Sequence, residues 1–427
     1  MFNKVELQEG VSLYIRQSDQ FKTINFSVKW KTCLDESKSA HRAVLANVLQ
    51  DSNSRYKTQS ELRKALDELY GTIIYTDAAK RGDTHMVSLY AECVNDEFVN
   101  GDGVVDQVLE LLRAVIFEPN FVNGQFDESI VGREKRSVKE RIRSLYDDKT
   151  RYAQKRMLEL LRPNSPASAS SNGTEQSIDA LTSEQLLEAY NKMIQEDEID
   201  IYVVGDIDIN SITEKIQKLF PFQARPARKR MTPEQMTGKD VGKVKHIREK
   251  QEMKQGKLHI GFSTPITLQH PDFAKMQVTN GVFGGFAHSK LFMNVREKES
   301  MAYYVSSSFA SHYGLVYVMA GIDANLEEKA VQLIQEQLDE LRNGNVTELE
   351  LEQTKALLSN GIKSAFDSPR GQIEVFDQFK ELDEHFTAEK LIAGWEAVTK
   401  EEIQKMASNI KLEIIYLLSG KEALTDE

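Results

Sequence analysis

The 427-residue chain has little of what several protein classes require. Its only cysteines are Cys33 and Cys93, which argues against a disulfide-stapled secreted fold, and we expect both thiols to be small buried groups in a reducing compartment. No window reaches the roughly 18 to 20 apolar residues of a membrane span. Residues 1–8 include Lys4 and Glu6 and lack the apolar core of a secretory signal. These features predict a cytoplasmic protein with no membrane span.

An excess of positive charge is missing too. Lys and Arg number 54 against 66 Asp and Glu, for a net charge of −12. A protein that binds nucleic-acid phosphates needs a basic face, so we expect no nucleic-acid partner. Hydrophobic residues make up 40% of the chain, an ordinary share for a globular protein. The length suggests two or three domains.

The first half contains strands and amphipathic helices without regular alternation. Ile24, Phe26, Val28 and Trp30 alternate with polar residues, the period of a half-buried strand. Further strands are expected at 11–15, 73–79, 84–93 and 199–205, and helices at 40–49, 60–70, 104–117, 126–144, 151–161 and 211–219. This order makes a parallel doubly wound sheet unlikely to form.

The second half repeats the first. A helix-capping signature at Thr182 leads to a strand ending at Gly205, and a similar segment from Thr399 leads to Gly420, 420 − 205 = 215 residues later. The elements between them also follow in the same order. We therefore predict an α+β protein of two homologous domains, each a mainly antiparallel sheet flanked by helices. The predicted domains are 1–222 and 255–427, joined by a linker at 223–254, because the stretch 221–254 has three prolines and many basic residues.

One stretch of the second half resembles a known family. It contains Gly284-Gly285, Ser289-Lys290-Leu291-Phe292, Arg296-Glu297-Lys298 and Ala302-Tyr303. This pattern is similar to the second-domain signature of the pitrilysin/insulinase family, which includes the mitochondrial processing peptidases and their bacterial relatives. The sequence departs from that signature at Ser300, where the family has glycine, and at Met301, where it has leucine.

The resemblance implies an inverzincin ancestry without the metal site. Active members carry His-x-x-Glu-His on a first-domain helix, and a later glutamate completes the zinc site. In the matching helix His41 is followed by Val44 and Leu45 at the base and second-ligand positions, and a shift of one residue places Arg42 and Ala46 at the ends. The position aligned with the third ligand is Arg141, beside Glu140. Aliphatic side chains offer a metal no lone pairs, so we expect no metal, no other cofactor, no catalytic residue and no peptidase activity of the chain alone.

The same resemblance implies that a pair of substrate-binding residues is retained. Arg296 and Tyr303 are seven residues apart, and in the family an Arg/Tyr pair at this spacing grips the substrate backbone. The alternative is a surface ion pair of Arg296 with Glu297 or Glu299 and a core tyrosine. Gly284-Gly285 fits either a close approach to substrate or, more simply, a turn between helices.

Other candidates have simple structural explanations. We expect His41 to be exposed on the polar side of its helix, and His288 to be a capping or surface residue. The cluster Asp383-Glu384-His385 is expected to form a solvated turn.

The favoured function is a non-peptidase subunit that binds unfolded peptide and assists a zinc-bearing partner chain through Arg296 and Tyr303. Extended peptide would add to a sheet edge near Ile24–Trp30 or Leu258–Phe262. One alternative is a peptide-binding or scaffolding homodimer without hydrolysis. Another is a metallopeptidase with unorthodox ligands.

Overall fold

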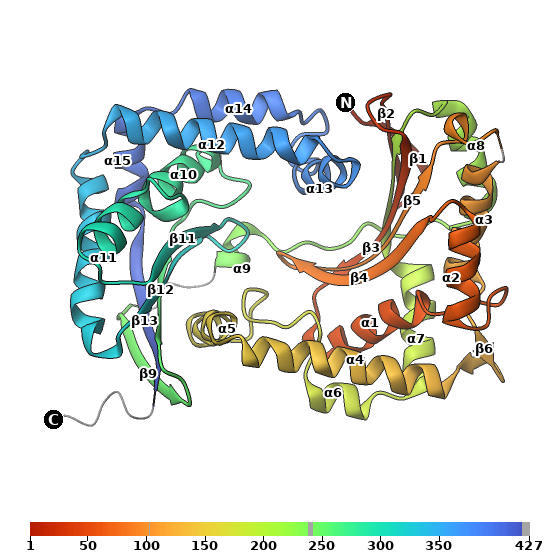
Figure 1. The fold of residues 1–427 in the computed structure, drawn as a ribbon, viewed down its shortest axis with the longest axis horizontal. Helices are drawn as coiled ribbons and strands as arrows, with labels where there is room; N and C mark the ends of the chain where they lie inside the picture. Colours follow the sequence, from red (N-terminus) through yellow and green to blue (C-terminus); the bar gives the residue numbers. More distant parts are fainter. Residues whose placement is uncertain (102, 238–241, 421–427) are drawn as a thin grey trace. The chain divides into compact units, whose positions relative to one another are not determined.

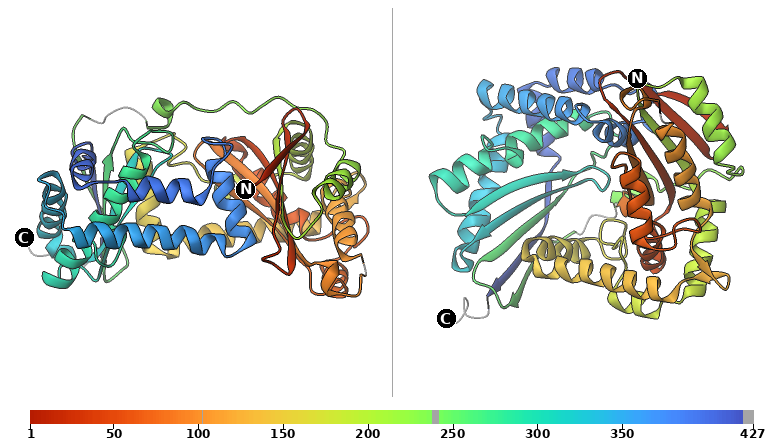
Figure 2. Two further views of the ribbon diagram at one scale, coloured as in Figure 1. Left: turned by 90° about the horizontal axis from the view of Figure 1, so that it is seen from above. Right: turned by 45° about the vertical axis from the view of Figure 1, so that its right-hand side comes forward.

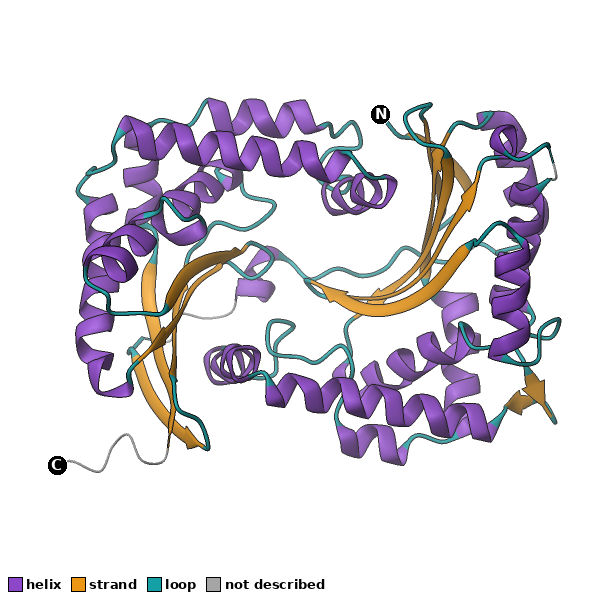
Figure 3. Ribbon diagram, in the orientation of Figure 1, coloured by secondary structure: helices purple, strands orange, loops and turns teal. Residues whose placement is uncertain are grey.

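A computed structural model describes residues 1–101, 103–237 and 242–420. The chain forms two compact units that are not continuous in sequence. Unit 1 contains Met1–Ser144, Ser170–Arg230 and Phe366–Phe386, and unit 2 contains Leu145–Ala169, Met231–Ala365 and Thr387–Glu427. Each unit has one mainly antiparallel sheet flanked by helices (Figure 3), so the predicted α+β class is confirmed.

The sheet of unit 1 has six strands in the order β1-β2-β8-β3-β5-β4, and only the β2–β8 pair is parallel. The strands are β1 (Asn3–Gln8), β2 (Val11–Gln17), β3 (Thr23–Cys33), β4 (Ile73–Arg81), β5 (Thr84–Val94) and β8 (Glu198–Gly205). The helices are α1 (Glu36–Leu49), α2 (Gln59–Glu68), α3 (Val104–Phe117), α4 (Glu128–Asp147), α6 (Glu175–Ala180), α7 (Ser183–Glu196), α8 (Ile209–Leu219) and α13 (Pro369–Phe379). The short strands β6 (Phe121–Val122) and β7 (Gln125–Phe126) form a separate ribbon.

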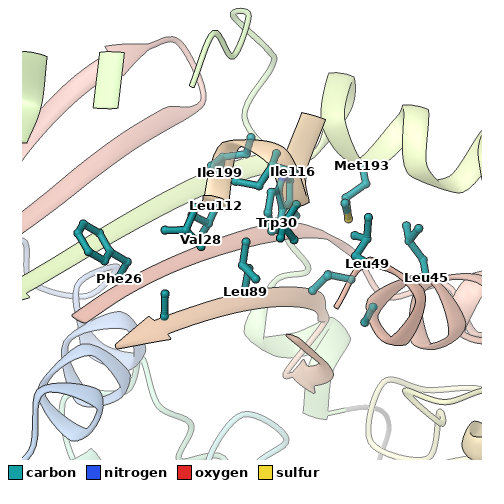
Figure 4. Packing of buried hydrophobic residues seen from close by; sticks show 14 of the residues in the cluster. Phe26, Val28, Trp30, Leu45, Leu49, Leu89, Leu112, Ile116, Met193 and Ile199 are labelled. Carbon is teal, nitrogen blue, oxygen red and sulfur yellow. The ribbon is translucent and has the colours of Figure 1, made fainter. Parts of the chain in front are cut away.

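The predicted alternation in β3 determines how unit 1 packs. Phe26, Val28 and Trp30 are at most 2% exposed and pack against α1, α3 and α7, where Leu45, Leu112 and Met193 contribute to the same core (Figure 4). The helices α1, α3, α7 and α8 thus cover one face of the sheet, while α13 lies on the other (Figure 1). Burial of this apolar face is the main source of the unit's stability.

The sheet of unit 2 has five strands in the order β11-β12-β10-β13-β9, and only the β13–β9 pair is parallel. The strands are β9 (Lys245–Gln251), β10 (Gly256–Ser263), β11 (Tyr304–Ala310), β12 (Leu315–Ile322) and β13 (Lys411–Gly420). The helices are α5 (Lys149–Leu161), α9 (Pro233–Thr237), α10 (Phe273–Asn280), α11 (Glu327–Arg342), α12 (Glu348–Phe366), α14 (Ala388–Glu396) and α15 (Lys400–Ser408). Two π-helical turns, Gly281–Gly285 and Leu291–Lys298, lie between α10 and β11.

The two sheets show the predicted repeat. The strands β2, β8, β3, β5 and β4 are matched in order and direction by β9, β13, β10, β12 and β11. Thr182 and Thr399 both form the expected capping boxes, at the starts of α7 and α15. In this pattern β9 matches β2, so the segment predicted as a linker contains a strand of the second sheet.

One helix in each unit comes from the other half of the sequence. Helix α5 packs on β10 and β13 of the second sheet, and α13 packs on β3 and β8 of the first. The units therefore follow packing, whereas the predicted domains followed chain order. Within unit 2, α12 and α14 lie side by side (Figure 2), where Lys355 Nζ donates to the carbonyl of Glu396 at 2.8 Å.

The predicted sheet edges are wrong. Strands β3 and β10, which contain Ile24–Trp30 and Leu258–Phe262, each pair on both sides because they lie inside their sheets. The edges are β1 and β4 in the first sheet and β11 and β9 in the second. Among the described residues, none of the helices combines the length and apolar character that crossing a bilayer needs.

Candidate functional site

Helix α1 is the element on which a zinc peptidase of this family would carry its motif. It begins after Asp35, whose side chain accepts from the backbone N–H of Ser37 and caps the helix. Val44 and Leu45 are fully buried in the core of unit 1. These two positions therefore stabilise the fold and have no donor atom to offer a metal.

The side of α1 that faces α4 has different chemistry. Asn47 Oδ1 accepts a hydrogen bond from Arg141 Nη2 at 3.1 Å, and Asp51, just beyond the helix, is paired with Arg133. The two contacts run in opposite order along the helices, so α1 and α4 are antiparallel here. Arg141, the position aligned with the third ligand of the family, thus lies against Asn47.

This arrangement places the guanidinium groups of Arg133 and Arg141 beside Asp51 and Asn47, whose side-chain oxygens could otherwise bind a metal. The Asp51 side chain is only 4% exposed, and its charge is balanced by the Arg133 guanidinium. A divalent ion at this place would be repelled by Arg133 and Arg141. In the part of the chain that the structure describes, no group of three or more His, Cys, Asp or Glu side chains could hold a metal.

His41 is half-buried, so the expectation that it is exposed is wrong. It lines a cavity on another side of α1, and its Nδ1 is buried without a hydrogen-bond partner in the described residues. Burial, followed by the charge of Lys38, lowers the pKa of His41, so the ring is neutral at pH 7.

The prediction that Cys33 is buried is also wrong, since its thiol is exposed and contacts the Lys229 carbonyl at 2.8 Å. Cys93 is buried as expected.

The Gly284-Gly285 pair serves packing. A Cβ added to Gly284 would lie 2.5 Å from Leu291 Cδ1 and 2.7 Å from Ser307 Oγ. The π-helical turns can therefore approach β11 only with glycine at this position. Ser300 has a φ of 52°, in the left-handed region where glycine is favoured, which explains why the family signature has glycine there.

Arg296 and Tyr303 lie on the surface of unit 2. The Arg296 guanidinium stacks over the ring of Phe292, 4.6 Å from its centroid, and Nε is 3.6 Å from Glu297 Oε1. Tyr303 is 60% exposed, so it is not a core tyrosine, and its hydroxyl donates to Asp323 Oδ1 at 3.2 Å. That hydrogen bond raises the pKa of Tyr303.

No hydrogen bond joins Arg296 to Tyr303 among the residues that the structure describes. Both side chains keep their polar atoms near solvent, and the backbone N–H of Tyr303 donates to the Gly321 carbonyl at 2.8 Å. The backbone of Tyr303 is therefore fixed just before the edge strand β11, while its side chain is largely exposed to solvent.

The remaining histidine candidates are structural. His288 is half-buried, stacks on Phe286, and shares a hydrogen bond of 2.8 Å between Nε2 and Thr354 Oγ1. Burial lowers its pKa. The segment 383–385 lies in a turn, in which Asp383 Oδ1 accepts from the backbone N–H of His385.

A buried charge network between β3 and α13 has no counterpart in the sequence interpretation. Asp377 accepts from Lys29 Nζ at 3.0 Å, from Arg81 Nη1 at 2.7 Å and from the Tyr202 hydroxyl at 2.5 Å. The other members are Lys31, Asp200, Glu374, Lys380, Tyr14 and Tyr90. Burial alone would raise the pKa of Asp377, but the surrounding cations hold it well below its usual value.

A signal for this network was present in β3. Lys29 and Lys31 occupy the strand face opposite Val28 and Trp30, and both are at most 3% exposed. Two lysines in the middle of a long strand indicate either solvent or buried counter-charges on that face. The counter-charges Glu374 and Asp377 come from a helix more than 300 residues away and Asp200 comes from β8, so chain order did not reveal them.

A protein of two such repeated α+β units, with the ligand positions of α1 lost and the second-domain signature kept, is an M16-type fold without its metal centre. Residues 180–358 match the family model described as Peptidase M16 inactive domain. The chain belongs to the M16 peptidase family, as an inactive-type homologue of its zinc peptidases. The resemblance inferred from the sequence is thereby confirmed.

Two relatives are similar over nearly the whole chain. "Probable inactive metalloprotease YmfF" of Bacillus subtilis (strain 168) is 36% identical over 414 residues, which cover 97% of this chain and 96% of that protein. The crystal structure of a conserved protein from Enterococcus faecalis V583 superposes with a TM-score of 0.92 at 32% identity and covers 100% of both chains. The structure of a peptidase M16 inactive domain from Pseudomonas fluorescens shares the fold, with a TM-score of 0.79 at 17% identity over the full length of both chains.

Proposed function

We propose that this chain is a non-peptidase subunit that binds unfolded peptide and assists a zinc-bearing partner of the same family. The observation that carries the proposal is the surface position of Arg296 and Tyr303 at the family's spacing, in a chain whose described residues contain no group of three or more potential metal ligands. Such a subunit could contribute substrate contacts while the partner supplies zinc and water. We place it in the cytoplasm, where its two thiols would stay reduced.

The edge strand β11 supports a role in peptide binding. It pairs only with β12 in the described sheet and begins directly after Tyr303. An extended peptide that added to β11 would run past the phenol of Tyr303, which could leave Asp323 and donate to a peptide carbonyl. Arg296 offers a planar set of donors for a second carbonyl or a carboxylate.

The test is reconstitution. The purified chain is mixed with a zinc-bearing relative from the same organism, and cleavage of an unfolded peptide is measured with each chain alone and with both together. We expect no cleavage by this chain alone, little by the partner alone, and strong cleavage by the mixture with co-purification of the two chains. Strict self-pairing and no gain in the mixture would instead indicate a scaffolding homodimer. Chelator-sensitive cleavage by the lone chain with stoichiometric zinc would indicate an unorthodox metallopeptidase.

A further inference from the structure

Unit 1 contains a cavity of about 710 Å³ that the proposed function does not use. It lies between the end of β3, the first half of α1, α7 and the segment 224–229. The lining includes Cys33, Lys38, His41, Arg42, Arg228 and Lys229. Asn47, Asp51, Arg133 and Arg141 do not line it, and of the positions compared with the zinc motif only His41 and Arg42 do.

Several buried donors in this lining have no acceptor in the described residues. Arg42 is 6% exposed, and its Nη1 and Nη2 donate to Asp197 and to the Trp30 carbonyl, but its Nε has no partner. The Arg228 side chain is 4% exposed and pairs through Nη1 with Asp83, and its Nε is also without a partner. An unsatisfied buried donor destabilises the folded state. A ligand with acceptor oxygens would remove that destabilisation.

The charges of the lining favour an anion. The basic residues are Lys31, Lys38, Arg42, Lys192, Arg225, Arg228 and Lys229, and the acidic residues are Asp35, Glu188, Glu196, Asp197 and Glu198, an excess of 7 − 5 = 2 positive charges. The main acidic groups are already engaged, because Asp197 pairs with Arg42, Glu188 pairs with Lys192, and Asp35 caps α1. Lys38 and Lys229 form no ion pair within the described residues.

We propose that this cavity binds a small organic anion through a carboxylate or phosphate group. Its volume lies within the range of roughly 300–1,000 Å³ that small-molecule sites occupy. Lys38 and Lys229 would neutralise the anion, and the Nε–H groups of Arg42 and Arg228 would hydrogen-bond its oxygens. The site does not depend on peptide binding by unit 2.

Cys33 provides a direct readout. Its exposed thiol lines the cavity, while Cys93 is buried. Alkylation of the native full-length chain by iodoacetamide is followed by mass spectrometry at constant ionic strength with glucose 6-phosphate, citrate or glucose. We expect at least one of the two anions to slow alkylation of Cys33 about threefold or more, and glucose to have no effect. Protection by only one anion distinguishes phosphate from carboxylate, and Cys93 stays unmodified while the protein is folded.

Two lysine substitutions test the contacts. Lys38→Ala removes an exposed cation of the lining, and Lys329→Ala removes an exposed cation on α11 of unit 2. We expect Lys38→Ala to lower the affinity for the protecting anion about three- to tenfold, and Lys329→Ala to leave that affinity unchanged. Both variants should have an unaltered circular dichroism spectrum. The proposal is overturned if neither anion protects Cys33, if glucose protects equally, or if Lys38→Ala binds as tightly as the unmodified chain.

Discussion

At the scale of single residues, the contact of Asp51 with Arg133 shows how the α1–α4 interface is stabilised without a metal. Asp51 is buried, whereas Arg133 is about half-exposed. A guanidinium fixed beside a desolvated carboxylate balances the charge of that carboxylate. We therefore expect this ion pair to contribute to the stability of the α1–α4 interface.

Removal of this guanidinium should destabilise unit 1. Arg133→Ala leaves Asp51 buried and without its ion pair, and we expect the free energy of unfolding to fall by about 1–3 kcal/mol. Adding Asp51→Asn to the same chain should recover much of the loss, because the neutral amide is less costly to bury. Urea denaturation measures both effects. Arg151→Ala, at a 75% exposed side chain, should cost under about 0.5 kcal/mol, and an equal loss there would contradict the argument.

Arg296 and Tyr303 should act in turnover and not in folding. Tyr303→Phe removes one exposed hydroxyl and Arg296→Ala one exposed guanidinium, so the melting temperature should stay nearly unchanged. Cleavage by the reconstituted complex should fall about tenfold or more if these groups bind the reacting peptide. Tyr70→Phe, at a tyrosine 53% exposed in unit 1, should leave turnover intact. Normal turnover of both variants would remove the assisting role.

At the scale of elements, the attachment of α13 to its sheet depends on charge. Helix α13 contributes Glu374 and Asp377 to a face of β3 that carries Lys29 and Lys31. The whole network adds little net stability, because burying its charges is costly. Loss of one member is nevertheless strongly destabilising, because the charges that it balanced remain buried without a partner.

Asp377→Asn should therefore be severely destabilising. We expect a loss of about 3–5 kcal/mol in the free energy of unfolding, with α13 released first, as seen by faster amide hydrogen exchange of residues 369–379. Glu384→Gln lies beyond α13, where the Glu384 side chain is 74% exposed and pairs with Lys4. This control should cost almost nothing. Equal stability of the two variants would show that apolar contacts alone hold α13.

The contact between α5 and β10 should be sensitive to acid. His259 is fully buried on β10, on the same face as Gly261, which lies under Leu161 and Met157 of α5. Burial, followed by the charge of Lys257, lowers its pKa from 6.5 to about 3. The folded chain thus keeps the ring neutral while the unfolded chain protonates it below pH 6.5, so stability decreases as the pH falls from 6.5 towards 3.

Between pH 6.5 and 5 this histidine should lower the free energy of unfolding by about 1.6 kcal/mol, with a slope that approaches about 1.4 kcal/mol for each pH unit below pH 6. Denaturation at several pH values measures the slope. His259→Leu should reduce it, although His85, which burial also shifts to a pKa of about 3, retains a similar slope in unit 1. An unchanged slope in His259→Leu would place the acid sensitivity elsewhere.

The element scale also shows what the sequence could predict. Period-2 and helical patterns located β3, α3 and the capped helices α7 and α15, because local burial determines those patterns. Strand β9 reads Lys-His-Ile-Arg-Glu-Lys-Gln and was interpreted as linker, because an edge strand held by backbone hydrogen bonds needs no apolar alternation. Asn47 and Asp51 could not be singled out, since only the packing of α4 shows which side of α1 they occupy.

At the scale of the whole molecule, the reciprocal placement of α5 and α13 bears on how the gene could be divided. A cut after residue 230 would yield two pieces of similar length, each with a complete sheet. The first piece would lack Glu374 and Asp377, which pair with Lys29, Lys31 and Arg81, and the second would expose the β10 face that α5 covers. We expect each piece to be insoluble when expressed separately and the pair to be recovered together on co-expression. On this expectation the two repeated halves fold only in each other's presence, and a break in the gene between them would have to keep both pieces in one cell.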